Sequence, residues 1–192
     1  MPGVYLRDKS DMVGAIVGVV SKKRLIDGQM NVKEGDIVYA IPSDGPHTNG
    51  YSLIRKVVKN SNGRIDSNVM EMLLKNHRCY YNEIQALWNA DINIHGMVHI
   101  TGGGYGGNIK RVINDDLMVS LKRWDLPEPF QTLQIEGNID TVEMFSTFNC
   151  GYGMLLFVNK SDVAKISDVL KEGVVVGIVS KKVEGVDKVI FI

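Results

Sequence analysis

The sequence GDIVYAIPSDGPHTNGYSLIRKV, residues 35–57, gives the clearest indication of the fold. Its first part, Asp36 to Pro42, is almost entirely apolar, which predicts a buried β-strand. From Gly50 to Asn60 the apolar residues instead share one face of a predicted helix, and they are Leu53, Ile54, Val57 and Val58. A strand that leads through a polar loop into an amphipathic helix is typical of domains in which helices pack on a sheet.

Similar patterns continue along the rest of the chain. Further strands are predicted at residues 13–20, 94–100, 117–122, 153–159 and 174–180. Further helices are predicted at residues 67–77, 82–90, 108–113, 141–148 and 161–172. Asp140, with Glu143 three residues later, has the spacing of a capping box at the start of one helix. Mixed strands and helices predict a layered α/β or α+β domain, and a length of 192 residues favours a single domain over 1–192.

A short sequence near the start of the chain recurs near its end. VGVVSKK at residues 17–23 matches VGIVSKK at residues 176–182. The match is too short to indicate a repeat architecture. We expect two buried strands that belong to one sheet, each with a glycine where backbones come close and lysines where the strand reaches solvent.

Composition excludes several classes of partner. The chain has 22 basic and 22 acidic residues and 44% hydrophobic residues, so we expect no nucleic-acid partner and no membrane partner. The aliphatic run at 13–20 is too short to span a bilayer, and the first twelve residues have no apolar core typical of a signal peptide. The two cysteines, Cys79 and Cys150, lack metal-type spacing and are expected to be reduced thiols. We therefore expect a cytoplasmic protein.

Two loops carry the candidate chemistry. Ser43 to Gly50 lies between a predicted strand and a helix, where sheets of α/β type bind ligands. His99 to Asn108, HITGGGYGGN, has the same context and contains five glycines, which leave N–H groups accessible to an anion. The second loop matches neither the dinucleotide fingerprint nor the P-loop. The loops indicate a phosphate-bearing small ligand, and the alternative is that both are simply turns rich in turn-forming residues.

The spacing of His95 and His99 raises the question of a metal site. On a helix the two imidazoles would lie together, but the segment is predicted to be a strand. There they would share a face about 13 Å apart, too far to hold one ion. We therefore expect no metal site, and His99 is either a buried structural residue or a ligand contact.

Five motifs occur in a fixed order along nearly the whole chain: MPGVY, GVVSKKRLIDG, the stretch at 35–57, HITGGG with NIKRV, and MFSTFNCGYGMLLFV. This order resembles that of the aminoimidazole ribonucleotide synthetase family, also called phosphoribosylformylglycinamidine cyclo-ligases, which act in purine biosynthesis. The resemblance covers only the C-terminal domain of that family. The chain departs from the family at Asp44, where serine is usual, and at Lys110, where proline is usual. In residues 76–84 it retains only Arg78 and Tyr80 of the family's PTRIYV segment.

The resemblance implies a three-layer α/β/α domain of the α+β class with a mixed sheet. It also implies an ATP-dependent ring closure, in which ATP activates an amide oxygen of formylglycinamidine ribonucleotide and a neighbouring nitrogen closes the imidazole. ATP and Mg²⁺ would bind mainly to the family's N-terminal half, outside this chain, so we expect neither on this chain alone.

The same resemblance suggests which residues hold the phosphoribosyl substrate: His47, Asn49, His99, Thr101, Gly102, Gly103 and Gly104. A separate N-terminal ATP-binding half is an expected partner, and the chain alone would be a monomer or a weak dimer. The alternative function is a free-standing, non-catalytic module that binds or sequesters a nucleotide or phosphoribosyl ligand.

Overall fold

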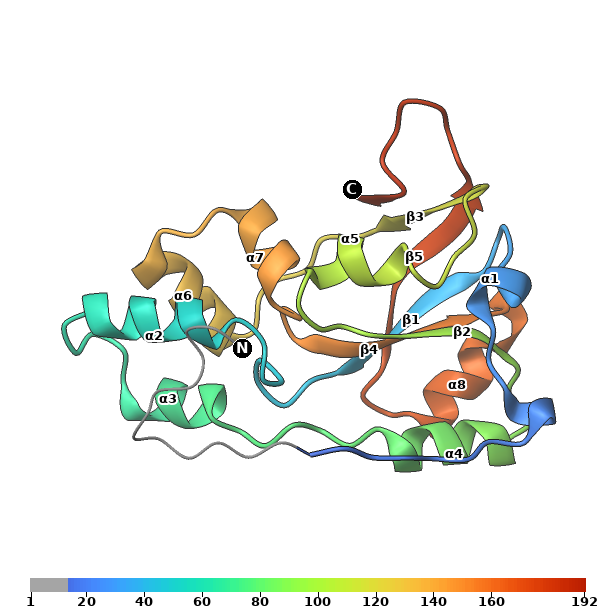
Figure 1. Ribbon diagram of the computed structural model, residues 1–192, viewed down its shortest axis with the longest axis horizontal. Helices are drawn as coiled ribbons and strands as arrows, with labels where there is room; N and C mark the ends of the chain where they lie inside the picture. Colours follow the sequence, from blue (N-terminus) through green and yellow to red (C-terminus); the bar gives the residue numbers. More distant parts are fainter. Residues whose placement is uncertain (1–13) are drawn as a thin grey trace.

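A mixed six-stranded sheet forms the centre of the computed structural model, which describes residues 14–192 (Figure 1). Its strands are β1 (Ile37–Pro42), β2 (Ile94–His99), β3 (Leu117–Leu121), β4 (Tyr152–Val158), β5 (Val174–Lys181) and β6 (Val189–Phe191). They lie in the order β2-β4-β1-β5-β3-β6. Neighbouring strands are antiparallel except β3 and β6, which are parallel.

Helices cover both faces of this sheet (Figure 1). One face carries α2 (Tyr51–Asn60), α3 (Ser67–Leu73), α5 (Gly104–Ile109), α6 (Glu128–Gly137) and α7 (Thr141–Thr147). The other face carries α4 (Tyr81–Asn89) and α8 (Val163–Val169). The remaining short elements are α1 (Gly28–Asn31), η1 (Lys22–Arg24) and η2 (Lys160–Asp162). The prediction of a three-layer α+β domain with a mixed sheet is confirmed.

Strand β1 shows why the sequence at 36–42 is apolar throughout. Val38 and Ala40 pack into the core under α2, α3, α5, α6 and α7, whereas Ile37, Tyr39 and Ile41 pack under α4 and α8. Successive side chains of a strand point to opposite faces, and here both faces are covered. Both sets of side chains are therefore removed from water.

Most of the predicted helices and strands are confirmed within a few residues. The cap at Asp140 is also confirmed, because its carboxylate accepts a hydrogen bond of 2.9 Å from the N–H of Glu143. Helix α6 was not predicted, since Pro127 and Pro129 obscure the pattern. Proline is nevertheless compatible with the first turn of a helix, and the apolar residues Phe130 and Leu133 are buried one turn apart.

The prediction of a buried strand at 13–20 is wrong. Position 13 and the MPGVY motif lie outside the described residues. Residues 14–20 form no regular element, and the side chains of Ile16, Val17 and Val19 are more than 90% exposed. Residues 176–181 of the matching VGIVSKK sequence belong to β5, which lies between β1 and β3. The expectation that both copies belong to one sheet is therefore also wrong within residues 14–192, because only the second copy has neighbouring strands to supply hydrogen bonds and apolar cover.

The helix predicted at 108–113 is also displaced. It begins at Gly104 and ends at Ile109, so its first turn consists mainly of glycines. Glycine disfavours a helix by about 1 kcal/mol relative to alanine, which is why the pattern did not indicate this start. Tyr105 and Ile109 anchor the helix instead, because both are fully buried. No helix in the part of the chain that the structure describes is long and apolar enough to cross a membrane.

Candidate functional site

The topology of the sheet brings the two predicted loops together. β1 and β2 both pair antiparallel with β4, which lies between them, so their carboxyl ends lie at the same edge. The loop at 43–50 follows β1 and the loop at 100–103 follows β2. The ring centroids of His47 and His99 are 6.0 Å apart. Asn49 reaches the second loop, since its Oδ1 lies 3.8 Å from the position of a Cβ built on Gly102.

The loop at 43–50 holds two residues in an unfavourable backbone conformation. His47 has φ of 53° and Thr48 has φ of 67°, and positive φ is rare for a β-branched residue. Asn149 stabilises this conformation through two hydrogen bonds. Its Oδ1 accepts from the hydroxyl of Ser43 at 2.9 Å, and its Nδ2 donates to the carbonyl of Gly45 at 2.9 Å. Backbone strain of this kind is concentrated at functional sites.

His47 is buried, and its hydrogen bonds fix the position of its proton. Its Nε2 accepts from the backbone N–H of Asp44 at 3.1 Å and, less closely, from that of Arg78 at 3.4 Å. The neutral ring therefore carries its proton on Nδ1, which is buried and has no partner among the described residues. Burial, together with the nearby charges of His77, His99 and Arg78, lowers the pKa of His47 to about 4.

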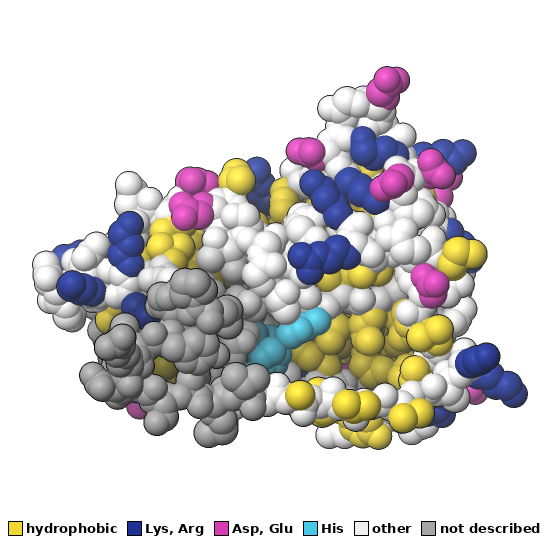
Figure 2. Space-filling view, viewed as in Figure 1, with side chains coloured by type: hydrophobic (Ala, Val, Ile, Leu, Met, Phe, Trp, Pro, Cys, Tyr) yellow, Lys and Arg dark blue, Asp and Glu magenta, His cyan; other side chains and the backbone are white. Residues whose placement is uncertain are grey.

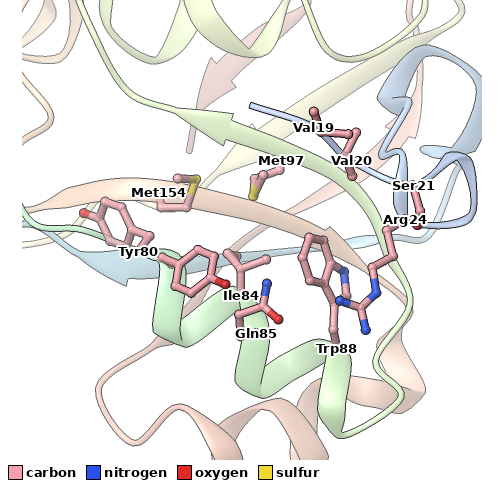
Figure 3. A pocket seen from close by; sticks show the side chains of 11 residues that line it. Val19, Val20, Ser21, Arg24, Tyr80, Ile84, Gln85, Trp88, Met97 and Met154 are labelled. Atoms are coloured by element: carbon pink, nitrogen blue, oxygen red, sulfur yellow. The ribbon is translucent and has the colours of Figure 1, made fainter. Parts of the chain in front are cut away.

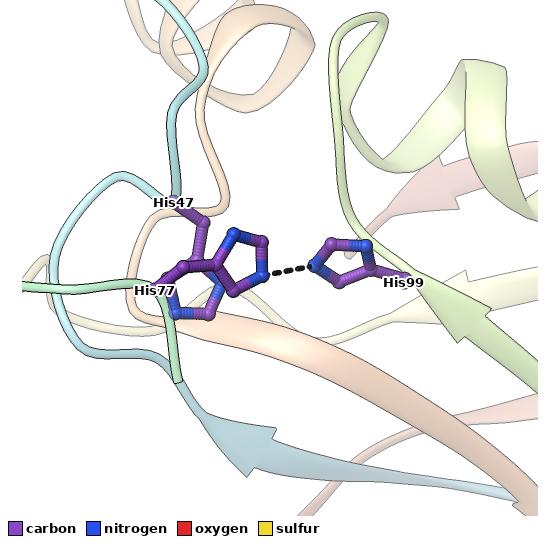
Figure 4. Close-up of side chains that lie close together, drawn as sticks. All are labelled: His47, His77 and His99. Atoms are coloured by element: carbon purple, nitrogen blue, oxygen red, sulfur yellow. Dashed lines mark hydrogen bonds between the residues drawn. The ribbon is translucent and has the colours of Figure 1, made fainter. Parts of the chain in front are cut away.

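His77 joins the two loops although the sequence did not suggest it. Its ring stacks on that of His47 with centroids 4.1 Å apart, and its Nε2 lies 3.0 Å from Nε2 of His99 (Figure 4). Burial, followed by the charge of His77, lowers the pKa of His99. One feature of the sequence could have indicated His77. Residues 76–84 depart from the family's PTRIYV segment, and in this chain an exposed histidine precedes Arg78. Arg78 is itself paired with two carboxylates, those of Glu83 and Glu172.

The glycine loop is held by Asn108, a second residue that the sequence did not single out. Its buried amide donates to the carbonyls of Thr101 at 3.1 Å and Gly104 at 2.6 Å, and accepts from the hydroxyl of Thr101 at 3.0 Å. Gly102 and Gly103 are exposed, whereas Gly104 is buried. A Cβ on Gly104 would overlap the backbone of Phe145 and Ser146 in α7. Gly104 therefore serves helix packing, and only Gly102 and Gly103 leave an open backbone.

A cavity of about 310 Å³ lies beside the open backbone of this loop. Gly103, Gly106 and Gly107 form one wall, and Lys110 and Arg123 contribute positive charge. Figure 2 shows basic side chains over α5 near the histidines, which lie at the margin of an apolar surface between α5 and α4. The site therefore has a basic side and an imidazole side.

The apolar surface contains a larger cavity of about 630 Å³, between α4 and the segment at 19–24 (Figure 3). Val20, Trp88 and Met97 are among the residues that line it, and the guanidinium of Arg24 lies over the ring of Trp88 at 5.2 Å. Tyr80 and Met154 lie at the end nearest the histidines: the ring of Tyr80 is 5.9 Å from that of His47, and Met154 pairs with His99 across the sheet. None of the predicted site residues lines this cavity.

His95 does not take part in the site. Its Nδ1 lies 2.7 Å from Oδ2 of Asp36, and both side chains are buried. The prediction that this segment is a strand is confirmed, because β2 spans Ile94–His99. His95 is a core residue whose polar ring is satisfied by Asp36.

The described site does not fit Mg²⁺. Within residues 14–192, one cluster of side chains could hold a metal ion, and it consists of His47, His77 and His99. Mg²⁺ prefers oxygen ligands in octahedral geometry, and three imidazoles do not provide them. These three residues therefore support no reaction step through a magnesium ion.

Comparisons with known proteins identify the family of the chain. A family model described as AIR synthase related protein, C-terminal domain, matches residues 33–190. A phosphoribosylformylglycinamidine cyclo-ligase from Neisseria meningitidis serogroup C / serotype 2a is 39% identical over 180 residues, which cover 90% of this chain and 52% of that protein. One from Oceanobacillus iheyensis is 39% identical over 171 residues, 85% of this chain and 50% of that protein. The chain thus spans about half the length of the curated relatives it matches.

Solved structures share the fold at much lower sequence identity. Thiamine monophosphate kinase from Aquifex aeolicus has a TM-score of 0.55 and 9% identity, with 85% of this chain and 52% of that chain covered. The protein tt0281 from Thermus thermophilus has a TM-score of 0.52 and 13% identity, with 83% and 50% covered. At this level of identity the likeness concerns the fold alone.

Proposed function

The chain belongs to the family of AIR synthase related proteins, as their C-terminal domain, and from this premise we propose that it is the substrate side of a cyclo-ligase that forms 5-aminoimidazole ribonucleotide. The observation that carries the proposal is the convergence of the loops after β1 and β2, where His47, Asn49 and His99 come together. ATP, when bound, would supply the activation of the amide oxygen, and we assign its site to a separate part of the enzyme.

The two sides of the site suit the two ends of a phosphoribosyl substrate. The N–H groups of Gly102 and Gly103 donate to no acceptor in the described part of the chain, and Lys110 and Arg123 line the adjacent cavity. These groups suit a phosphate. On the other side, the uncharged imidazoles of His47 and His99 and the amide of Asn49 suit the polar, nitrogen-rich end of formylglycinamidine ribonucleotide. The described residues would bind and orient the substrate rather than attack it.

The apolar surface supports association with an ATP-binding half. Val17 and Val19 are more than 90% exposed, and the neighbouring cavity is lined mostly by apolar side chains. Exposed apolar patches of this kind mark contact surfaces. We expect the chain alone to be a monomer or a weak dimer, which light scattering measures. We expect it to be located in the cytoplasm, which cell fractionation tests.

Calorimetry with formylglycinamidine ribonucleotide tests the proposal. We expect binding by the chain without ATP, and a loss of affinity of about tenfold in Asn49→Ala, which removes one hydrogen-bonding group from the site. Asn82→Ala on the exposed first turn of α4 is the matched control and should bind normally. Addition of the N-terminal half of the Neisseria relative, with ATP and Mg²⁺, should give ring closure. Binding without turnover under these conditions would instead favour the sequestering module, and no binding at all would contradict both functions.

A further inference from the structure

The sequence led us to expect no metal site, but His77 changes that expectation. We propose that His77 and His99 bind one divalent transition-metal ion of the zinc type between their Nε2 atoms, and that His47 donates a hydrogen bond to a further ligand of that ion. One ring nitrogen of each of the three histidines lies within 4.8 Å of the other two. The side chains come from three separate segments, the loop after β1, the segment before α4 and the end of β2 (Figure 4).

The separation of the two Nε2 atoms is close to that in a metal site. They lie 3.0 Å apart, whereas two imidazole nitrogens on a tetrahedral zinc ion are about 3.3 Å apart, given Zn–N bonds of about 2.0–2.1 Å. A widening of about 0.3 Å is within the reach of side-chain rotation, since His77 is exposed. Without a metal, the two nitrogens can only share one proton. A metal ion would accept a lone pair from each.

His47 is placed to support this ion rather than to ligate it. Its Nε2 is occupied by the backbone N–H of Asp44, which leaves the proton on Nδ1. That N–H is buried, and it has no acceptor among the described residues. A buried donor without a partner costs about 1–3 kcal/mol. A water, hydroxide or anionic ligand on the metal would supply the acceptor that Nδ1 lacks.

The chemistry of the cluster selects the class of metal. Neutral imidazoles suit Zn²⁺, Cu²⁺ and Ni²⁺, while Mg²⁺ and Ca²⁺ prefer oxygen ligands. The nearby guanidinium of Arg78 is paired with Glu83 and Glu172, so its charge is partly compensated. The ligand His77 lies in the segment where the sequence departs from its family. The inference therefore does not depend on the proposed function, and its test uses metal alone.

The test is a titration of the chelator-treated, tag-free chain with Zn²⁺ at neutral pH, followed by calorimetry. We expect one ion per chain, no comparable binding of Mg²⁺, and a shift of the Nε2 signals of His77 and His99 in imidazole nitrogen NMR spectra. His77→Ala and His99→Ala should each lower the zinc affinity by more than about tenfold, since each removes a direct ligand.

Two variants separate this site from other sources of binding. Cys79→Ser removes the exposed thiol two residues from His77 and should retain the wild-type zinc affinity. His77→Ala alters an exposed side chain, so its thermal unfolding without metal should remain cooperative. Wild-type affinity in either histidine variant would overturn the proposal, as would loss of binding in Cys79→Ser or the absence of a zinc-dependent shift at His77 and His99.

Discussion

Gly153 on β4 leaves the space that the imidazole of His47 occupies. A Cβ built on Gly153 would lie 2.5 Å from Cε1 and 2.6 Å from Nδ1 of that ring, and would also overlap the hydroxyl of Tyr80. Tyr80 cannot retreat freely, because its hydroxyl donates to the carbonyl of Pro42 at 2.9 Å. A single glycine in the sheet thus determines where the ring of His47 lies.

Gly153→Ala should therefore displace His47 and destabilise the fold. We expect a loss of about 1–3 kcal/mol in the free energy of unfolding, the usual cost of overpacking a core, measured by urea denaturation. Gly106→Ala is the control, because a Cβ there meets no atom within 4 Å and alanine favours the helix. If the two variants were equally stable, the contact between Gly153 and His47 would not constrain the site.

Asn149 should be required for the loop at 43–50. Asn149→Ala removes the partners of the Ser43 hydroxyl, the Gly45 carbonyl and the Gly151 N–H, and Asn149 is 1% exposed. We expect a loss of about 2–4 kcal/mol in unfolding free energy, since the groups left behind are poorly solvated. Asn82→Ala, an exposed residue, should change stability by less than about 0.5 kcal/mol. Amide exchange at 43–50 should rise in the Asn149 variant alone.

Stability should fall when the pH is lowered from neutral. The pKa of His47 is about 4 in the fold, compared with 6.5 for an unperturbed side chain, so the unfolded chain binds the proton more readily. The stabilising contribution of neutral His47 is complete above pH 6.5 and is lost progressively between pH 6.5 and 4, with a slope of at most about 1.4 kcal/mol per pH unit. Urea denaturation with a chelator present measures it. His47→Gln should have a smaller slope between about pH 5 and 6.5, and an unchanged slope would contradict the assignment.

The sequence predicts those features that depend on local pattern. β1 was predicted because its residues form a continuous apolar run, and α2 because its apolar residues share one helical face; the core covers both elements. The meeting of His47 with His99 depends on strand order, which local pattern does not predict. The family resemblance implied only that both residues contribute to one substrate site. His77, Asn108 and Asn149 were not predicted, because their roles depend on contacts with other segments: His77 with two loops, Asn149 with the backbone of Gly45, and Asn108 with the backbone of Thr101 and Gly104.

The two similar sequences VGVVSKK and VGIVSKK show most directly that local sequence does not determine burial. Val17 is 93% exposed, whereas its counterpart Val176 is 4% exposed within the sheet. Val176→Ala should lower the free energy of unfolding by about 1–3 kcal/mol, since it removes buried methyl groups from the core. Val17→Ala, the matched variant, should change it by less than about 0.5 kcal/mol. Equal losses in urea denaturation would indicate that residues 14–20 are packed in solution.

The glycines of HITGGG should separate into two classes on substitution. Gly104→Ala adds a Cβ that overlaps the backbone of α7 at a φ of 56°, so we expect a loss of stability of about 3 kcal/mol or more. Gly103 has a φ of 93°, and a Cβ there would meet only the Cα of Gly107, at an ordinary contact distance of 3.8 Å. Gly103→Ala should therefore lose about 1–2 kcal/mol from backbone strain alone. Urea denaturation of both variants measures this difference.

Gly103→Ala also tests whether the backbone at Gly103 approaches a phosphate. Gly103 lines the cavity that contains Lys110 and Arg123, so a methyl group there would occupy ligand space. We expect Gly103→Ala to bind the ribonucleotide more weakly than the wild type in calorimetry well below the melting temperature. At that temperature the variant is folded, so a loss of stability alone would not change the affinity. If Gly103→Ala were destabilised and bound the ribonucleotide with wild-type affinity, the glycines would serve only the turn into α5, and the phosphate would have to bind elsewhere on the chain.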